Sequence, residues 1–235
     1  MTAKTVLVVA AHPDDEVLGC GATSAWHATC GDRVEVLILG EGATSRASTD
    51  KIVGRRDEVT TLQAAATTAA KILGTCEPRF VGLADNRMDE EALLQIVKVI
   101  EAVVSEVRPA VIYTHFGGDL NVDHQIVHAA VLTACRPLPQ SSVREIHTYE
   151  TLSSTEWAAT QQHRAFEPNL FVDVGETLDR KLQALTAYHD EMRHFPHPRS
   201  LKAVEALAHF RGASVGLSAA EAFATVRRIS GPGRV

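Results

Sequence analysis

The stretch TVLVVAAHPDDEVLGCGAT, residues 5–23, joins an apolar run to a histidine and three consecutive acids. The run Thr5–Ala11 has the length and composition of a buried β-strand. Like charges crowded together cost free energy unless a cation, a proton or water compensates them. The end of a core strand is also where α/β enzymes place their chemistry. The stretch therefore predicts a first strand that ends in a site, and a metal ion is the obvious compensating cation.

Outside this stretch, strand-like and helix-like segments alternate. Strands are predicted at Thr5–Ala11, Val34–Leu39, Phe80–Leu83, Ala110–Thr114, Glu145–Tyr149 and Leu170–Val174. Helical spacing of apolar residues runs over Val17–Cys30, Arg55–Leu73, Asp89–Val107 and Asp123–Cys135. The region from Gly175 on is predicted to be mainly helical, with the segment HFPHPRS (194–200) interrupting it. This alternation predicts an α/β fold in three layers, a mostly parallel sheet with helices on both faces.

The bulk composition narrows the class of protein. At 235 residues and 45% hydrophobic, the chain can bury a proper core, and we expect one domain over 1–235. A net charge of −6, with no basic stripe, argues against a nucleic-acid binder. The cysteines are widely spaced, as in reduced proteins: Cys20, Cys30, Cys76 and Cys135. Asp14 interrupts the first apolar run too early for a signal peptide or membrane span, so a soluble, cytoplasmic protein is expected.

In such a sheet, the loops after the parallel strands meet at one rim. These loops are predicted at His12–Glu16, Gly40–Arg46, Asp85–Met88 and His115–His124 (HFGGDLNVDH), and all are rich in polar groups. A simpler interpretation of the first loop, taken by itself, is a hydrogen-bonded turn in which Asp14 or Asp15 caps the next helix. Against it, the stiff turn at Pro13 can aim Asp14 and Asp15 at different partners, one at a metal and one at the metal's water.

Two other patterns are set aside. His124 and His128 are four residues apart, as in a zincin helix, but Gln125 stands where that motif needs its glutamate base. His128 is therefore interpreted as a packed or supporting residue. The trio Gly19-Cys20-Gly21 is an incomplete dinucleotide fingerprint that follows a charge cluster. It is interpreted as small residues that let a helix pack close to the sheet.

The motif AHPDDE (11–16) with NVDH (121–124) resembles the LmbE/PIG-L zinc deacetylases. The resemblance covers most of the chain and extends to R-x-x-E at Arg55–Glu58, Leu73-Gly74, Asp85–Met88 and AEAF at 220–223. It implies a Rossmann-like fold, one zinc ion held by His12, Asp15 and His124, and Asp14 as general base. Independently, three N/O ligands with an open position are typical of catalytic zinc, although iron or another divalent ion could use the same set.

The resemblance also implies the rest of the catalytic set. Asp123, beside the ligand His124, is counted in it because neighbours orient metal-bound histidines. Asn121 stands where many relatives carry a histidine, so it can donate to an oxyanion but cannot shuttle a proton. Substitutes for the missing acid are sought among loop histidines that are individually better explained as solvated: His115, His194 and His197.

For the substrate, the resemblance implies an N-acetylated amino sugar or conjugate, deacetylated by metal-activated water. Asp85 matches a position that relatives use to contact sugar hydroxyls, and His194 and His197 are counted with it as substrate-binding. Arg46 and Arg55 could hold a phosphate, carboxylate or nucleotide group. Equally, Arg55 could pair with Glu58 and Asp85 could cap a helix.

Two alternative functions stay open. One is a zinc amidase that cleaves a larger amide of a sugar–thiol conjugate. The other is a sugar- or nucleotide-binding module without catalysis, which has no need of a base such as Asp14 beside a metal. An assembly of identical chains is compatible with the resemblance.

Overall fold

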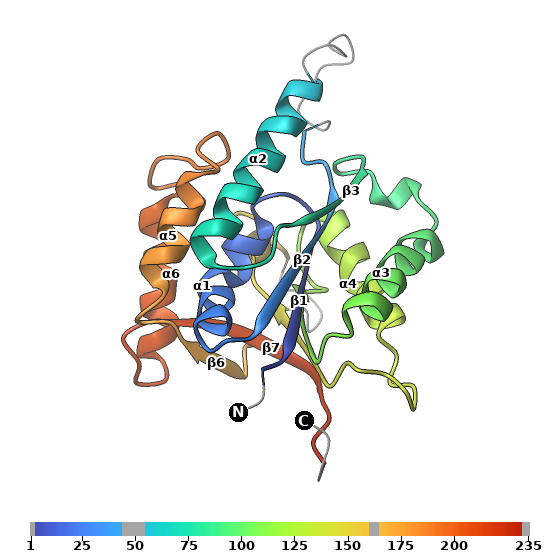
Figure 1. Ribbon diagram of the computed structural model, residues 1–235. Helices are drawn as coiled ribbons and strands as arrows, with labels where there is room; N and C mark the ends of the chain where they lie inside the picture. Colours follow the sequence, from blue (N-terminus) through green and yellow to red (C-terminus); the bar gives the residue numbers. More distant parts are fainter. Residues whose placement is uncertain (1–2, 44–54, 160–164, 232–235) are drawn as a thin grey trace.

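The computed structural model describes residues 3–43, 55–159 and 165–231 (Figure 1). Its central feature is a seven-stranded sheet in the order β3-β2-β1-β4-β5-β7-β6. The strands are β1 Thr5–Ala10, β2 Arg33–Gly40, β3 Arg79–Leu83, β4 Val111–His115, β5 Glu145–Tyr149, β6 Leu170–Asp173 and β7 Ala220–Arg228. The predicted strands are confirmed to within about a residue at most ends.

The sheet is parallel from β3 to β5, and β7 runs antiparallel to both β5 and β6. From β1 the chain first builds outward through β2 and β3, and later builds the other way through β4 and β5. The carboxyl ends of β1 and β4 are therefore adjacent at a reversal of strand order. This is the point where open α/β sheets bind their ligands.

Helices cover both faces of the sheet. The helices are α1 Asp15–Thr29, α2 Arg55–Leu73, α3 Leu93–Val107, α4 Val122–Ala134, α5 Leu178–Thr186 and α6 Leu201–Ala213, with short 3-10 turns η2 Met88–Glu90 and η3 Thr155–Trp157. In Figure 1, α1, α2, α5 and α6 lie on one side and α3 and α4 on the other. The three-layer arrangement is thus confirmed.

The alternation of side chains along β1 explains why the sheet is covered twice. Val6, Val8 and Ala10 belong to the core under α1, α2 and α5. Leu7, Val9 and Ala11 belong to the core under α3 and α4. All six are fully buried, because successive residues of a strand point to opposite faces and both faces here are apolar.

The structure differs from the sequence-based expectation in two places. The tail contains α5 and α6 as expected, but Ala220–Arg228 forms strand β7 between β5 and β6. The helix predicted over Asp89–Val107 is split into η2 and α3. The buried Met88 donates its N–H to Asp123 Oδ1 at 3.0 Å, and this contact ties the loop to α4, so the helix begins only at Leu93.

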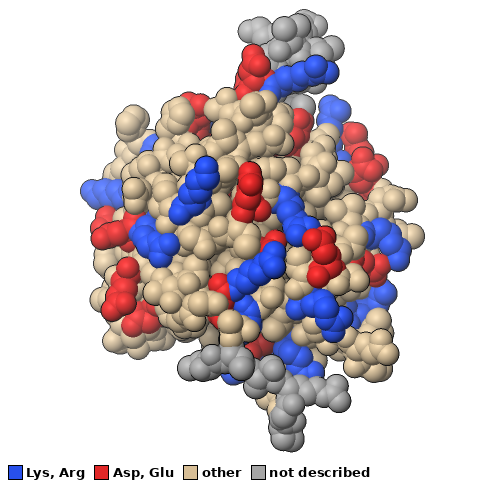
Figure 2. Space-filling view, viewed as in Figure 1, with Lys and Arg blue, Asp and Glu red and all other residues tan. Residues whose placement is uncertain are grey.

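No helix in the described ranges is long and apolar enough to cross a membrane. On the face shown in Figure 2, basic and acidic side chains are interspersed.

Candidate active site

In the turn after β1, neither Asp14 nor Asp15 caps helix α1 with its side chain. Asp14 occupies the N-cap position of α1, yet its side chain makes no capping hydrogen bond. Its φ of 105° is unusual for a residue other than glycine, and such strained positions cluster at functional sites. The Asp14 N–H donates to Glu16 Oε2 at 3.0 Å. The Asp15 carboxylate accepts the His12 N–H at 2.9 Å rather than capping the helix. The capping interpretation is therefore wrong for both residues.

His12, Asp15 and His124 come together as predicted, with one ligand atom from each within 4.8 Å of the others. Asp15 Oδ2 lies 3.3 Å from His12 Nδ1 and 3.3 Å from His124 Nε2. Asp15 and His124 are 0% and 1% exposed. The three side chains come from the end of β1, the start of α1 and the start of α4, so the adjacency of β1 and β4 creates the group.

A second group of possible ligands shares His12 and adds Asp85 and Asp123. Its oxygens already have donors: Asp123 accepts the N–H groups of Asn86 at 2.8 Å and Met88 at 3.0 Å, and Asp85 Oδ1 accepts from the Asn86 amide at 3.1 Å. In the first group, by contrast, Asp15 Oδ1 and His124 Nε2 are buried without a hydrogen-bond partner among the described residues. Buried polar atoms need a partner. The first group is therefore the one that fits a metal ion.

Both candidate histidine ligands have a carboxylate beside the other ring nitrogen. Asp123 Oδ2 lies 2.9 Å from His12 Nε2, and Asp119 Oδ1 lies 3.1 Å from His124 Nδ1. Asp119 is itself held by two hydroxyls and a backbone N–H, those of Ser154, Thr155 and Asn121. Such carboxylates are the usual outer partners of metal-bound histidines. Sequence reasoning missed Asp119, although it stands in the quoted stretch HFGGDLNVDH.

The charges around this group favour a cation. Burial acts to lower the pKa of His12, but hydrogen bonds with Asp123 and Asp15 outweigh it and raise that pKa to about 10. Burial also acts to lower the pKa of His124, but the charge of Asp15 and the hydrogen bond with Asp119 outweigh it and raise that pKa to about 9. The carboxylates thus stabilise positive charge here, which a divalent ion supplies when the histidines are neutral.

His115 packs against the candidate ligand His124 and bonds to the backbone at Ala11. Its Nε2 accepts the Ala11 N–H at 2.9 Å, and its ring stacks on His124 with centroids 3.8 Å apart. Burial holds the pKa of His115 well below its usual range. His128 Nδ1 contacts the His115 carbonyl at 2.9 Å, as expected of a supporting residue. A neutral, fully buried ring already bonded to backbone is poorly placed to act as the missing acid.

Asp14 faces a cation from the distant C-terminal region. Arg199 Nη1 donates to Asp14 Oδ2 at 2.9 Å. Burial raises the pKa of Asp14 to about 8 against the lowering effect of Arg199. Arg199 belongs to the segment HFPHPRS, from which the sequence singled out His194 and His197. His194 is exposed, while His197 Nδ1 accepts the Arg199 N–H at 3.1 Å.

The remaining predicted residues are placed as follows. Asp85 is buried with Oδ1 3.1 Å from His12 Nε2, and it does not cap α3, whose N-cap is Ala92. Asn121 caps α4 through its side-chain oxygen, and its amide donates to Asn86 Oδ1 at 2.9 Å. Arg46 lies outside the described residues, as does the side chain of Arg55.

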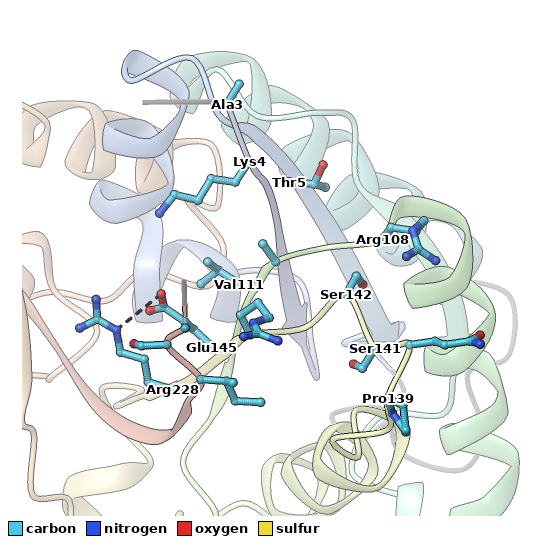
Figure 3. A pocket seen from close by; sticks show the side chains of 16 residues that line it. Ala3, Lys4, Thr5, Arg108, Val111, Pro139, Ser141, Ser142, Glu145 and Arg228 are labelled. Carbon is cyan, nitrogen blue, oxygen red and sulfur yellow. Dashed lines mark ion pairs between the residues drawn. The ribbon is translucent and has the colours of Figure 1, made fainter. Parts of the chain in front are cut away.

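A cavity of about 930 Å³ lies elsewhere, at the amino ends of β1, β4 and β5 (Figure 3). Its lining includes Lys4, Arg108, Arg144 and Arg228, the last paired with Glu145 at 3.7 Å. None of the candidate catalytic residues lines it. This cavity is therefore separate from the candidate ligand group His12, Asp15 and His124.

Comparison with known proteins identifies the family of the chain. The PIG-L family, described as GlcNAc-PI de-N-acetylase, matches residues 7–135. The chain is 32% identical over 178 residues to the uncharacterized deacetylase YaiS of Escherichia coli (strain K12), covering 74% of this chain and 83% of that protein.

Two further proteins are more distant. A probable N-acetyl-alpha-D-glucosaminyl L-malate deacetylase 2 of Bacillus cereus is 26% identical over 192 residues, which cover 80% of this chain and 84% of the relative. The solved N,N'-diacetylchitobiose deacetylase from Pyrococcus horikoshii, in complex with its inhibitor MPG, superimposes with a TM-score of 0.76 at 18% identity. That match covers 96% of this chain and 84% of the other, and it shows the shared fold.

Proposed function

Because the chain belongs to the PIG-L (LmbE-like) family, we propose that it removes the acetyl group from N-acetylated amino sugars or their conjugates. The observation that carries the proposal is the buried group His12, Asp15 and His124, with its unpartnered atoms, beside the carboxylate of Asp14. Two of the proteins named above act, by their names, on an N-acetylglucosaminyl conjugate and on a diacetylated disaccharide.

His12, Asp15 and His124 would hold one divalent ion, and two nitrogens with one carboxylate suit zinc. When bound, such an ion acidifies water and polarises a carbonyl oxygen. The choice of ring nitrogen follows from the contacts. His12 Nε2 faces Asp123 at 2.9 Å, which leaves Nδ1 toward Asp15 at 3.3 Å. His124 Nδ1 faces Asp119 at 3.1 Å, which leaves Nε2 toward Asp15 at 3.3 Å.

Asp14 is assigned the proton transfer. Its carboxylate would take a proton from the attacking water. The protonated Asp14 would then give this proton to the nitrogen of the departing amine, so that one residue acts as base and then as acid. A carboxylate has about four lone-pair sites on two oxygens, so the bond from Arg199 to Oδ2 leaves acceptor capacity for this proton. Asp14 has to be ionised to act, and both Arg199 and a bound cation favour the ionised form.

The role of Asn121 as a hydrogen-bond donor to the oxyanion stays a prediction. Its amide oxygen accepts the Asp123 N–H at 2.8 Å and its amide nitrogen donates to Asn86. Through these contacts it would at least fix the start of α4, and with it His124.

Substrate recognition is proposed for Asp85, whose carboxylate lies next to the ligand group and can accept hydrogen bonds from sugar hydroxyls. Arg46 and Arg55 are proposed to bind an anionic group attached to the sugar. The malate carried by the substrate named for the Bacillus relative is an anion of this kind.

The test is release of acetate and free amine, in equal amounts, by the zinc-loaded protein. The probes are N-acetylglucosamine, N,N'-diacetylchitobiose, an N-acetylglucosaminyl malate and an N-acetyl amino acid. We expect activity on the sugars, and a fall of ~10²–10⁴-fold in kcat for Asp14→Asn with metal retained. Equal rates on the N-acetyl amino acid would instead indicate a general amidase. Metal binding without turnover of any probe would favour a binding module.

A further inference from the structure

Arg199 links three segments of chain at the edge of the site. Its Nη1 donates to Asp14 Oδ2 at 2.9 Å, across 185 positions of sequence. Its Nε donates to Ser153 Oγ at 2.7 Å, in the loop after β5. The same Nη1 lies 3.5 Å from Glu191 Oε2, just beyond α5. The side chain is 20% exposed, so these contacts form in a largely dry environment where they are strong.

The buried carboxylate of Asp14 is surrounded by other acids, so a cation such as Arg199 stabilises it. It is 2% exposed and lies among three other acids, Asp15, Glu16 and Glu191, whose charges repel its own. Its backbone is fixed, since its N–H bonds to Glu16 and its carbonyl accepts from Val17 at 3.0 Å. Fixing the backbone does not fix the side-chain rotamer, however, and repulsion from neighbouring carboxylates would turn the Asp14 carboxylate away.

The two bonds of Arg199 require a guanidinium. One nitrogen is held by Ser153 while another holds Asp14, and the planar group keeps the two donors in a rigid relation. A lysine ammonium is a single point on a flexible stem and cannot reproduce both contacts at a fixed angle.

The loop after β5, whose Ser153 bonds to Arg199, also contacts Asp119 behind the candidate ligand His124. Ser153 accepts from Arg199, and the next two residues, Ser154 and Thr155, donate to Asp119. Asp119 in turn lies 3.1 Å from Nδ1 of the candidate ligand His124. One short loop therefore sets both the carboxylate that would move the proton and the ring that would bind the metal.

We propose that Arg199 is a positioning residue for the proposed deacetylation, holding the Asp14 carboxylate in the one orientation from which it takes the proton. The inference rests on the proposed function and adds to it a residue supplied by the C-terminal segment. Arg199 acts through Asp14 rather than on substrate. Its loss is therefore expected to lower kcat and to leave KM and metal content nearly unchanged.

The test is a double-mutant cycle on the zinc-loaded enzyme. Arg199→Ala should lower kcat by ~10–100-fold, the cost of misplacing a catalytic group by about 1 Å. In the Asp14→Asn background the same change should have almost no further effect, because the group it positions is already gone. Arg199→Lys should be intermediate. The matched control is Arg193→Ala, whose guanidinium is exposed and donates only to the carbonyls of Asp190 and Met192.

Two kinetic results would overturn the proposal. One is a loss of kcat that is as large in the Asp14→Asn background as in the wild type, which would indicate a general structural role. The other is an unchanged kcat for Arg199→Ala in an enzyme that is otherwise active.

A crystal structure of Arg199→Ala gives a readout that needs no substrate. We expect the Asp14 carboxylate to turn or to occupy several orientations. A single unchanged orientation would refute the positioning role even if the wild type deacetylates none of the probes.

Discussion

Replacing Asp119 with asparagine tests the support behind the metal group. Asp119 is 2% exposed, and Oδ1 lies 3.1 Å from His124 Nδ1. Loss of an outer carboxylate of this kind costs ~10–100-fold in metal affinity, which corresponds to about 1.4–2.7 kcal/mol. We expect the upper part of this range. Three donors converge on the two Asp119 oxygens, from Ser154, Thr155 and Asn121, and an asparagine offers only one oxygen to them.

The measurement is the zinc dissociation constant, by competition with a chromogenic chelator. The matched control is Asp89→Asn, which removes the same charge from an exposed position on η2. The free energy of unfolding of the metal-free variant, measured in parallel, separates lost metal affinity from lost stability. A dissociation constant within about twofold of wild type, well short of the expected range, would refute the reasoning that Asp119 orients His124.

Three further predictions concern other parts of the fold and site. Gly19→Ala should lower the free energy of unfolding by ~1–3 kcal/mol, since the added methyl would lie 2.2 Å from Tyr149 Cδ2; an unchanged denaturation midpoint would contradict this packing. Lys181→Met should cost ~3–5 kcal/mol, because it leaves Glu221, 2.6 Å away, buried without its cation; a loss below about 1 kcal/mol, the range of a surface pair, would contradict it. Asp85→Ala should lower kcat/KM on the sugar probes by ~3–10-fold, the worth of one or two hydrogen bonds, with zinc content unchanged; loss of the metal would instead make Asp85 a ligand.

Much of the fold could be predicted because both faces of the central strands are apolar. The runs around Val6–Ala10 and Val34–Leu39 have few alternatives to a buried parallel strand, and the helices between them show regular spacing. The interpretation of Gly19 as a position that lets a helix pack close to the sheet is confirmed, since an added Cβ there would strike the Tyr149 ring on β5.

Strand β7 could not be predicted from its own residues. Its sequence, AEAFATVRR, contains three alanines, one glutamate and two arginines, all of which favour helix. It becomes a strand because β5 and β6 both pair with it, and such tertiary context routinely outweighs local propensity.

The candidate site also contains residues that the sequence predicts and residues that it does not. His12, Asp14, Asp15 and His124 stand in two compact motifs, so their proximity could be predicted from the sequence. Arg199 reaches Asp14 from 185 positions away through the packing of the C-terminal segment. No spacing rule signals such a contact, and the sequence of this segment, HFPHPRS, points to its histidines rather than to Arg199. The expectation of one domain over 1–235 stays a prediction.

Anomalous diffraction at the zinc absorption edge, from a crystal of the zinc-loaded protein, tests the central claim most directly. The unpartnered Asp15 Oδ1 and His124 Nε2 predict a single peak bounded by His12, Asp15 and His124, next to the Asp14 carboxylate. A peak among His12, Asp85 and Asp123, or no peak at either group, would contradict the account.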